Sequence, residues 1–135
     1  MIFVAVVAAA GFIGLNASGA LTPHHNVAGT FELIDTKADF PSIQVVGGSC
    51  KGTGGYSDLG PGTPVTLKDG EGKVLGATTL GNGSGSTRDC LFTFSFASVP
   101  EASFYSLEVG KRGELTYSLA DMQSRSWAIG GTIGS

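Results

Sequence analysis

The sequence predicts an all-β domain, a sandwich of seven or eight strands, preceded by one N-terminal transmembrane helix. Three observations support this prediction. Short runs of β-branched and aromatic residues recur about every ten residues, as in sandwiches of short strands. The 22 glycines supply turns, and only 14% of the residues are charged. Residues 2–21 carry no charge. We therefore expect an anchor at residues 1–21, a polar stalk at 22–28 and an extracytoplasmic domain at 29–135.

Residues 2–21 are long enough to cross a bilayer. As an α-helix, twenty residues extend about 30 Å, the thickness of the hydrocarbon core. Ala10, Gly14 and Ser18 recur every four residues and would form a stripe that lets another helix approach closely. This pattern predicts a retained anchor that packs against other membrane-protein subunits, with membrane lipid around it.

A cleaved signal peptide is the alternative for the same segment. Small residues follow the apolar run, and either Ala17 with Gly19 or Ser18 with Ala20 could occupy the −3 and −1 positions of a cleavage site. Both interpretations place the domain on the extracytoplasmic side. They differ in whether the protein stays attached to the cell membrane or is secreted.

The first half of the domain alternates between short strands and glycine-rich segments. Thr30–Asp35 is expected to form the first strand, and Ile43–Val46 a second short one. Residues 47–62 contain seven glycines and are predicted to form a loop rather than regular structure. Tyr56, Ser57 and Asp58 lie in this loop and are the candidate residues for contacting a ligand or partner.

A hairpin and a second loop are expected next. Pro64–Lys68 and Lys73–Leu75 flank Asp69 and Gly70, and an Asp-Gly turn between two such runs is typical of a β-hairpin. Gly81–Ser86 has the composition of a flexible loop.

The clearest strand is Cys90–Phe96. Cys90, Phe92, Phe94 and Phe96 fall on one face at a period of two, which predicts the centre of the core. Trp127 is expected to join this core. The remaining predicted elements are strands at 103–109, 114–118 and 127–133, with a short helical turn at 119–124.

Cys50 and Cys90 are the two cysteines of the chain and are predicted to form a disulfide. In an exported domain of this size, pairing is the usual state. A bond that closes a loop of this length would stabilise the fold by about 4 kcal/mol in the chain-entropy model. A buried free pair and a nucleophilic cysteine are the alternatives.

Residues for catalysis or metal binding are scarce in this sequence. The two histidines, His24 and His25, lie in the predicted stalk, so a Ser-His-Asp or Cys-His site is not expected in the domain. Two histidines and a paired cysteine do not supply a zinc site. Asp69 is better explained by turn formation than by calcium binding. We expect no cofactor, no metal and no enzymatic activity.

Nucleic acid is not an expected partner. The longest basic run is Lys111-Arg112 and the net charge is −3, whereas nucleic-acid binding needs a basic stripe.

Two resemblances add to this interpretation. The run GTPVTLKDGEGKVLGATTL followed by LFTFSFASVPEASFYSLEV resembles prealbumin-like and immunoglobulin-like Greek-key modules. Residues 29 to about 134, through the GGYSD motif at 54–58 and the Arg112-Gly113 motif, resemble a family of exported actinobacterial proteins with one anchor and one such domain. That family has no established activity. The resemblance implies the anchored topology and the Cys50–Cys90 bridge.

The sequence thus leads to two functional hypotheses. The first is a non-catalytic, membrane-anchored interaction module that serves as an accessory subunit of a larger bacterial envelope complex. The second is an anchored or secreted sandwich that binds a small ligand or a glycan through the loop around Tyr56.

Overall fold

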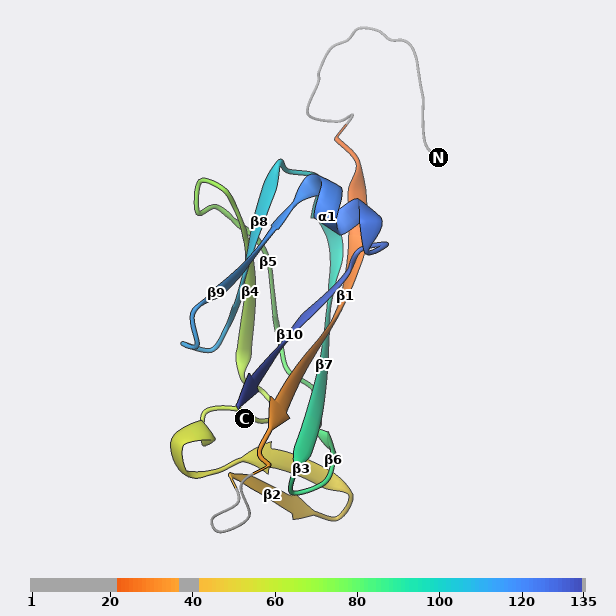
Figure 1. Ribbon diagram of the computed structural model, residues 1–135. Coiled ribbons are helices and arrows are strands. Elements are labelled where there is room, and N and C mark those ends of the chain that lie inside the picture. The colour runs from red at the N-terminus through yellow and green to blue at the C-terminus, as the bar shows by residue number, and fades with distance from the viewer. Residues whose placement is uncertain (1–21, 37–41, 135) are drawn as a thin grey trace, which may run out of the picture.

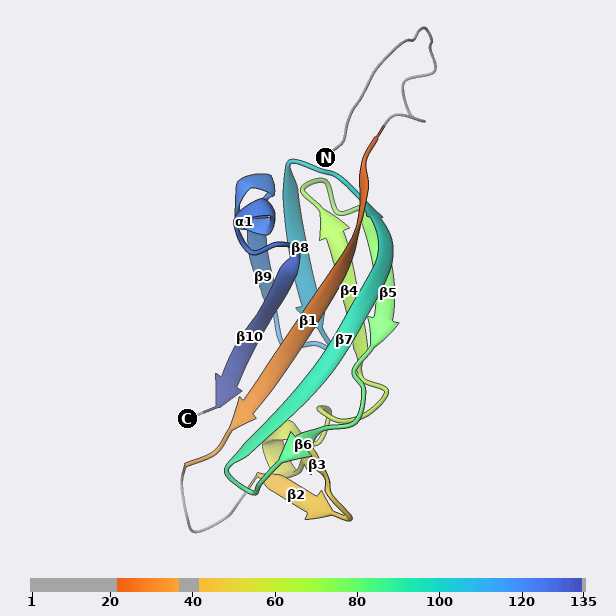
Figure 2. The ribbon, with the colours of Figure 1, turned by 90° about the vertical axis from the view of Figure 1, so that its right-hand side faces the viewer.

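Two four-stranded β-sheets pack face to face in this domain, with a two-stranded hairpin at one end (Figures 1 and 2). The computed structural model describes residues 22–36 and 42–134. The first sheet, here the β1 sheet, has the order β10 (Ala128–Gly134), β1 (His24–Ile34), β7 (Asp89–Pro100), β6 (Ser84–Gly85). The second, the β4 sheet, has the order β5 (Val74–Thr79), β4 (Pro64–Asp69), β8 (Phe104–Val109), β9 (Glu114–Ser118).

The hairpin pairs β2 (Ile43–Val46) with β3 (Ser49–Gly52). A short 3-10 turn, η2 (Gly54–Tyr56), follows it, and the helical turn α1 (Leu119–Ser124) lies at the opposite end of the molecule (Figure 1). The described residues thus form ten strands rather than the seven or eight that were predicted. This arrangement is consistent with the predicted β-sandwich.

The core lies between the two sheets, and β7 supplies its central row. Cys90, Phe92, Phe94 and Phe96 are buried, and each residue between them is exposed. This confirms the predicted alternation. From the facing sheet, β8 buries three side chains, again at a period of two. These are Tyr105, Leu107 and Val109.

The first strand begins earlier than the sequence pattern indicated. Residues 24–28, predicted to belong to a stalk, lie in β1, which pairs with β7 from His24 opposite Pro100 onward. Val27 is 1% exposed and starts the inward row that continues through Gly29 and Phe31. Asn26 and Gly29 hide this row in the sequence, because asparagine and glycine are depleted in strands.

Both glycine-rich segments contain strand structure, contrary to the prediction. Residues 47–62 contain β3 and η2, and residues 81–86 contain β6. The reason is visible between β2 and β3, where Gly47 (φ +59°) and Gly48 (φ +85°) form the turn. Two successive residues with positive φ suit a tight two-residue hairpin turn.

The predicted disulfide is confirmed and attaches this hairpin to the sandwich. Cys50 on β3 is bonded to Cys90 on β7, with a distance of 2.04 Å between the two sulfurs. The backbone N–H of Cys50 also donates to the carbonyl of Gly83 at 3.1 Å. The hairpin is therefore held by one covalent bond and by backbone pairing.

The strands and the helical turn that were predicted between residues 64 and 134 are also present. β4 and β5 form the expected hairpin, and Oδ1 of Asp69 accepts from the backbone N–H groups of Glu71 and Lys73, each at 2.9 Å, as expected of turn chemistry. α1 is capped by reciprocal bonds between Ser118 and Asp121. Within the part of the chain that the structure describes, no helix is long and apolar enough to cross a membrane.

Replacing Gly83 should destabilise the domain, because its neighbours cannot move. A Cβ at Gly83 would lie 2.5 Å from Sγ of Cys90 and even nearer the carbonyl oxygen of Cys50. We expect Gly83→Ala to lower the free energy of unfolding by about 1–3 kcal/mol, the usual cost of overpacking. Urea denaturation checks this, with Gly55→Ala as control, since a Cβ at Gly55 meets nothing within 4 Å. Equal stability of the two variants would contradict the explanation.

Candidate functional site

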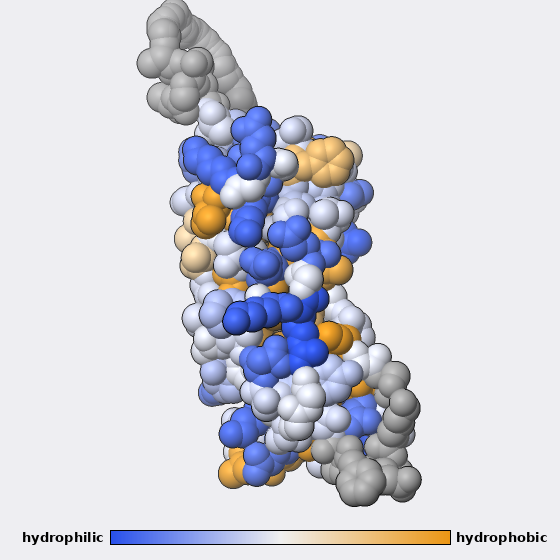
Figure 3. All heavy atoms as spheres, turned by 90° about the vertical axis from the view of Figure 1, so that its left-hand side faces the viewer, coloured by the Kyte–Doolittle hydropathy of each residue, from blue (hydrophilic) through white to orange (hydrophobic). Residues whose placement is uncertain are grey.

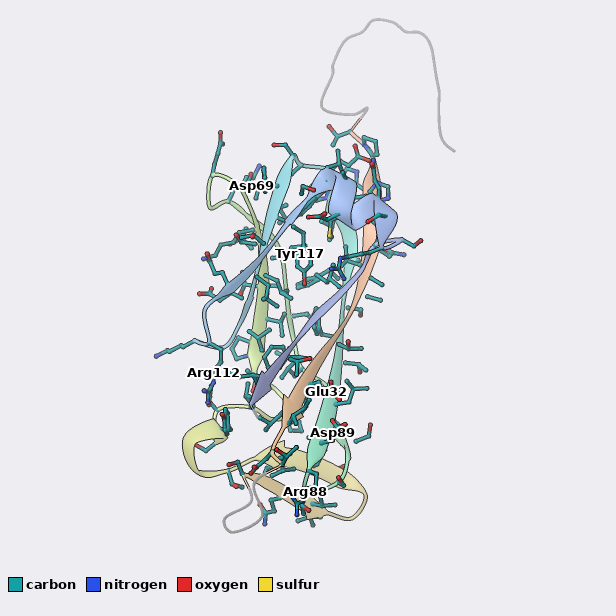
Figure 4. All side chains as sticks on the ribbon, viewed as in Figure 1. Glu32, Asp69, Arg88, Asp89, Arg112 and Tyr117 are labelled. Atoms are coloured by element: carbon teal, nitrogen blue, oxygen red, sulfur yellow. A yellow bond between two sulfur atoms is a disulfide. The ribbon has the colours of Figure 1, made fainter. Side chains whose placement is uncertain are left out.

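Arg112 joins the loop after β3 to the turn between β8 and β9 (Figure 4). Its Nε donates to Oδ2 of Asp58 at 2.9 Å, and its Nη2 donates to Oδ1 of Asp58 and to the carbonyl of Gly55. The guanidinium carbon lies 4.8 Å from the centre of the Tyr56 ring, within cation–π distance. The structure thus brings together the GGYSD and Arg-Gly motifs, which are more than fifty residues apart in sequence.

The contact between Arg112 and Asp58 shifts the pKa of both groups. Hydrogen bonding to Arg112 holds the pKa of Asp58 below its ordinary value, and the same contact raises the pKa of Arg112. The side chains of Tyr56 and Asp58, predicted to contact a ligand or partner, therefore bind Arg112 within the molecule. Ser57 is exposed between them.

A buried leucine and the hydrogen bonds of a threonine hydroxyl hold this loop in place. Leu59 is fully buried, and the hydroxyl of Thr63 donates to the carbonyl of Asp58 at 2.6 Å and accepts from the N–H of Gly60 at 3.0 Å. On the facing turn, Gly110 has a φ of +56°. A side chain there would press against Thr63 at 3.3 Å. Glycine therefore permits the approach that lets Arg112 reach Asp58.

An apolar cleft opens between the edge strands β9 and β10, and Arg112 lies at its rim. The cleft has a volume of about 250 Å³ and is lined mainly by apolar side chains from both sheets. Toward α1, the gap between the two strands is closed by the hydroxyl of Tyr117, which donates to the carbonyl of Gly130 at 2.9 Å. The sequence pattern did not reveal this cleft. Its apolar lining consists of Phe31, Leu107, Val109, Leu115 and Ile133.

Two carboxyl groups meet on the outer face of the β1 sheet. Glu32 on β1 and Asp89 on β7 are drawn together in Figure 4, at the margin of a shallow surface groove. Hydrogen bonding to Asp89, followed by burial and the Asp89 charge, raises the pKa of Glu32 above its ordinary value. Because the folded pKa of Glu32 is raised, its protonated form favours the folded state at low pH, and this contribution is lost as the pH rises through the folded pKa.

His25 is not the solvated side chain that a stalk would provide. Its ring stacks on Trp127 with centroids 3.8 Å apart, and its Nε2 lies 2.9 Å from a carboxylate oxygen of Glu101. Trp127 adopts a φ of +62°, unusual for a bulky residue, and Tyr105 packs edge-on against it. This cluster fastens the start of β1 to the β7–β8 connection. It is built from segments far apart in the sequence, which gave no local signal for it.

The predicted helix-packing residues Ala10, Gly14 and Ser18 lie outside the described residues. Within 22–36 and 42–134, no group of three or more His, Cys, Asp or Glu side chains is arranged to hold a metal ion.

Comparison with protein-family models, with curated proteins and with solved structures gave no match to this chain. The two resemblances stated above therefore remain predictions from the residues that carry them.

Replacing Arg112 should cause a small, pH-dependent loss of stability. Because the folded pKa of Asp58 is lowered, its ion pair stabilises the fold above the unfolded pKa of about 4, and this contribution disappears as the pH falls. The pair is partly exposed, so we expect Arg112→Gln to cost at most about 1 kcal/mol at pH 7.

Urea denaturation of wild type and variant between pH 3 and pH 7 measures this difference. Lys111→Gln is the matched control, because it removes one positive charge from the same turn at an exposed position. A stability gap of equal size at pH 3 and pH 7 would contradict the assignment to the Asp58 ion pair.

Proposed function

We propose that this protein is a non-catalytic interaction module, anchored in the cell membrane with its domain on the extracytoplasmic side, and an accessory subunit of a larger envelope complex. One observation carries the proposal. Only Thr22 and Pro23 separate the uncharged residues 2–21 from β1. A segment of this length and composition is suited to span a bilayer, and the domain then follows the membrane directly.

The disulfide supports the extracytoplasmic side. Bonds such as Cys50–Cys90 persist in oxidising compartments and are rare in the cytosol. The immunoglobulin-like or prealbumin-like Greek-key character predicted from the sequence belongs to this proposal, because such sandwiches commonly present their ends to other proteins.

The end of the domain opposite to the start of β1 offers a surface for a partner. The β2–β3 hairpin lies there (Figure 1), and Val46 and Val45 are 65% and 38% exposed. Apolar residues, orange in Figure 3, are exposed at both ends and in the middle of the face shown there, among more polar residues. Exposed apolar side chains on a hairpin held by a disulfide support protein–protein contact.

Ligand binding is the second candidate function, and an apolar cleft supports it better than the loop around Tyr56 does. The side chains of Tyr56 and Asp58 are already in contact with Arg112. The apolar cleft between β9 and β10 is the feature that would accept a small apolar group, although its volume of about 250 Å³ lies just below the usual range for ligand pockets.

Gly14→Leu should disrupt assembly with the partner subunits without changing the fold of the β-domain. Under the proposal, Ala10, Gly14 and Ser18 form a helix-packing stripe, and a leucine there prevents close approach. Co-purification in mild detergent after cross-linking in native membranes measures the loss of partners. Gly19→Leu is the control, because the same replacement falls about 140° around the helix from Gly14.

Two results would overturn this proposal. One is loss of partners to the same extent in the Gly14→Leu and Gly19→Leu variants. The other is unchanged assembly in the Gly14→Leu variant together with loss of a bound small molecule when Leu115, at the mouth of the cleft, is replaced by Arg. The second result would favour the ligand-binding function.

A further inference from the structure

The start of β1 is fixed firmly to its neighbours at one end of the sandwich. His24 lies opposite Pro100 at the end of β7, and the carbonyl of Pro23 accepts a hydrogen bond from the N–H of Glu101 at 2.9 Å. His25 adds its contact with the Glu101 side chain. The chain therefore leaves the domain at a defined point, beside the β7–β8 connection. We call this end of the sandwich the N-terminal end.

The link between this point and the uncharged segment is short. From Leu21 to His24 the chain advances three residues, which span at most about 10 Å when fully extended. The inference that follows rests on the proposed function, namely that residues 2–21 are anchored in a bilayer. With that anchor, the N-terminal end lies within about 10 Å of the membrane surface.

Two large apolar side chains are exposed at the same end. Phe104 and Val74 are each 54% exposed. Phe104 follows Glu101 by three residues and opens β8, and Val74 opens β5 just after the β4–β5 turn. The turn and β8 adjoin, because Asp69 pairs with Tyr105, and a Cβ at Gly70 would lie 3.4 Å from that of Phe104.

We propose that the N-terminal end docks on the bilayer through Phe104 and Val74, which enter the interface between headgroups and acyl chains. Phenylalanine is among the side chains with which proteins at membrane surfaces enter this boundary. The anchor makes the contact intramolecular, so two side chains suffice where a free domain would need a larger apolar face.

The charges at this end set the lipid preference. The β4–β5 turn carries Asp69, Glu71 and Lys73, and Glu101 lies at the chain exit, so the end is acidic on balance. Attraction to anionic lipid therefore does not drive the docking, and a zwitterionic bilayer is its natural surface. The β2–β3 hairpin, at the opposite end of the sandwich (Figures 1 and 2), then points away from the membrane.

Tryptophan quenching by brominated lipid tests the docking in the full-length chain. The protein is reconstituted in phosphatidylcholine nanodiscs whose lipids carry bromine near the headgroup end of the acyl chain. Three variants each add one tryptophan, while Trp127, the single native tryptophan, remains as a common background. Phe104→Trp probes the docking surface, Gln123→Trp probes exposed α1 at the same end, and Val46→Trp probes the far hairpin.

We expect the emission added by Phe104→Trp to be lost in brominated discs, and the emission added by Gln123→Trp and by Val46→Trp to persist. Val74→Trp is a second probe of the docking surface and should behave like Phe104→Trp. It keeps the test decisive if the Phe104 variant does not fold.

Other outcomes overturn the proposal in distinguishable ways. If the protein stays in the discs and Phe104→Trp and Val74→Trp are no more quenched than Val46→Trp, the docking is wrong and the anchor stands. Equal quenching of Gln123→Trp and Phe104→Trp also overturns it, because the contact is then not specific to these side chains. If the chain does not remain with the discs at all, the proposed membrane anchoring itself is wrong.

Discussion

β1 and β7 run antiparallel along the whole length of the sandwich, and the two ends of this ladder position what the protein presents to its surroundings. Their pairing runs from His24 opposite Pro100 to Ile34 opposite Asp89. Its inner face carries the phenylalanine row of β7, which fills the space between the sheets. At one end it fixes the exit of the chain beside Glu101. At the other end, Cys90 holds the β2–β3 hairpin through the disulfide. The register of this ladder shifts once, between His25 and Val27. From Val27 onward, a slip by one residue would turn the whole row outward, so the core and the disulfide end depend on one register.

Two contacts of charged side chains join segments that are distant in sequence. His25 and Glu101 join β1 to the β7–β8 connection, and Arg112 and Asp58 join the loop after β3 to the β8–β9 turn. Both contacts are partly exposed, and the exposed Arg112–Asp58 ion pair contributes little stability by itself. These contacts favour one arrangement of loops and turns whose glycines would otherwise allow many backbone conformations. Glu32 and Asp89 are different, because their like charges oppose each other on the outer face of the β1 sheet.

Local patterns predicted the strands whose two faces differ in polarity. The period-two row in β7, the Asp69-Gly70 turn and the pairing of Cys50 with Cys90 were all visible in the sequence. Glycine composition was misleading at 47–62, where successive glycines with positive φ form a hairpin turn instead of a loose loop. The stacking of His25 on Trp127 and the Arg112–Asp58 contact could not be predicted, since each joins residues more than fifty positions apart. The cleft between β9 and β10 depends on which strands are edges, and only the topology determines that.

The assembly role and the orientation of the domain both depend on the retention of residues 2–21. The most direct test is the intact mass of the protein, tagged at its C-terminus and purified from the membranes of its native host. We predict a mass that includes residues 2–21, in protein that resists carbonate extraction. A mature chain beginning at Ala20 or Leu21 and recovered in the soluble fraction would contradict it.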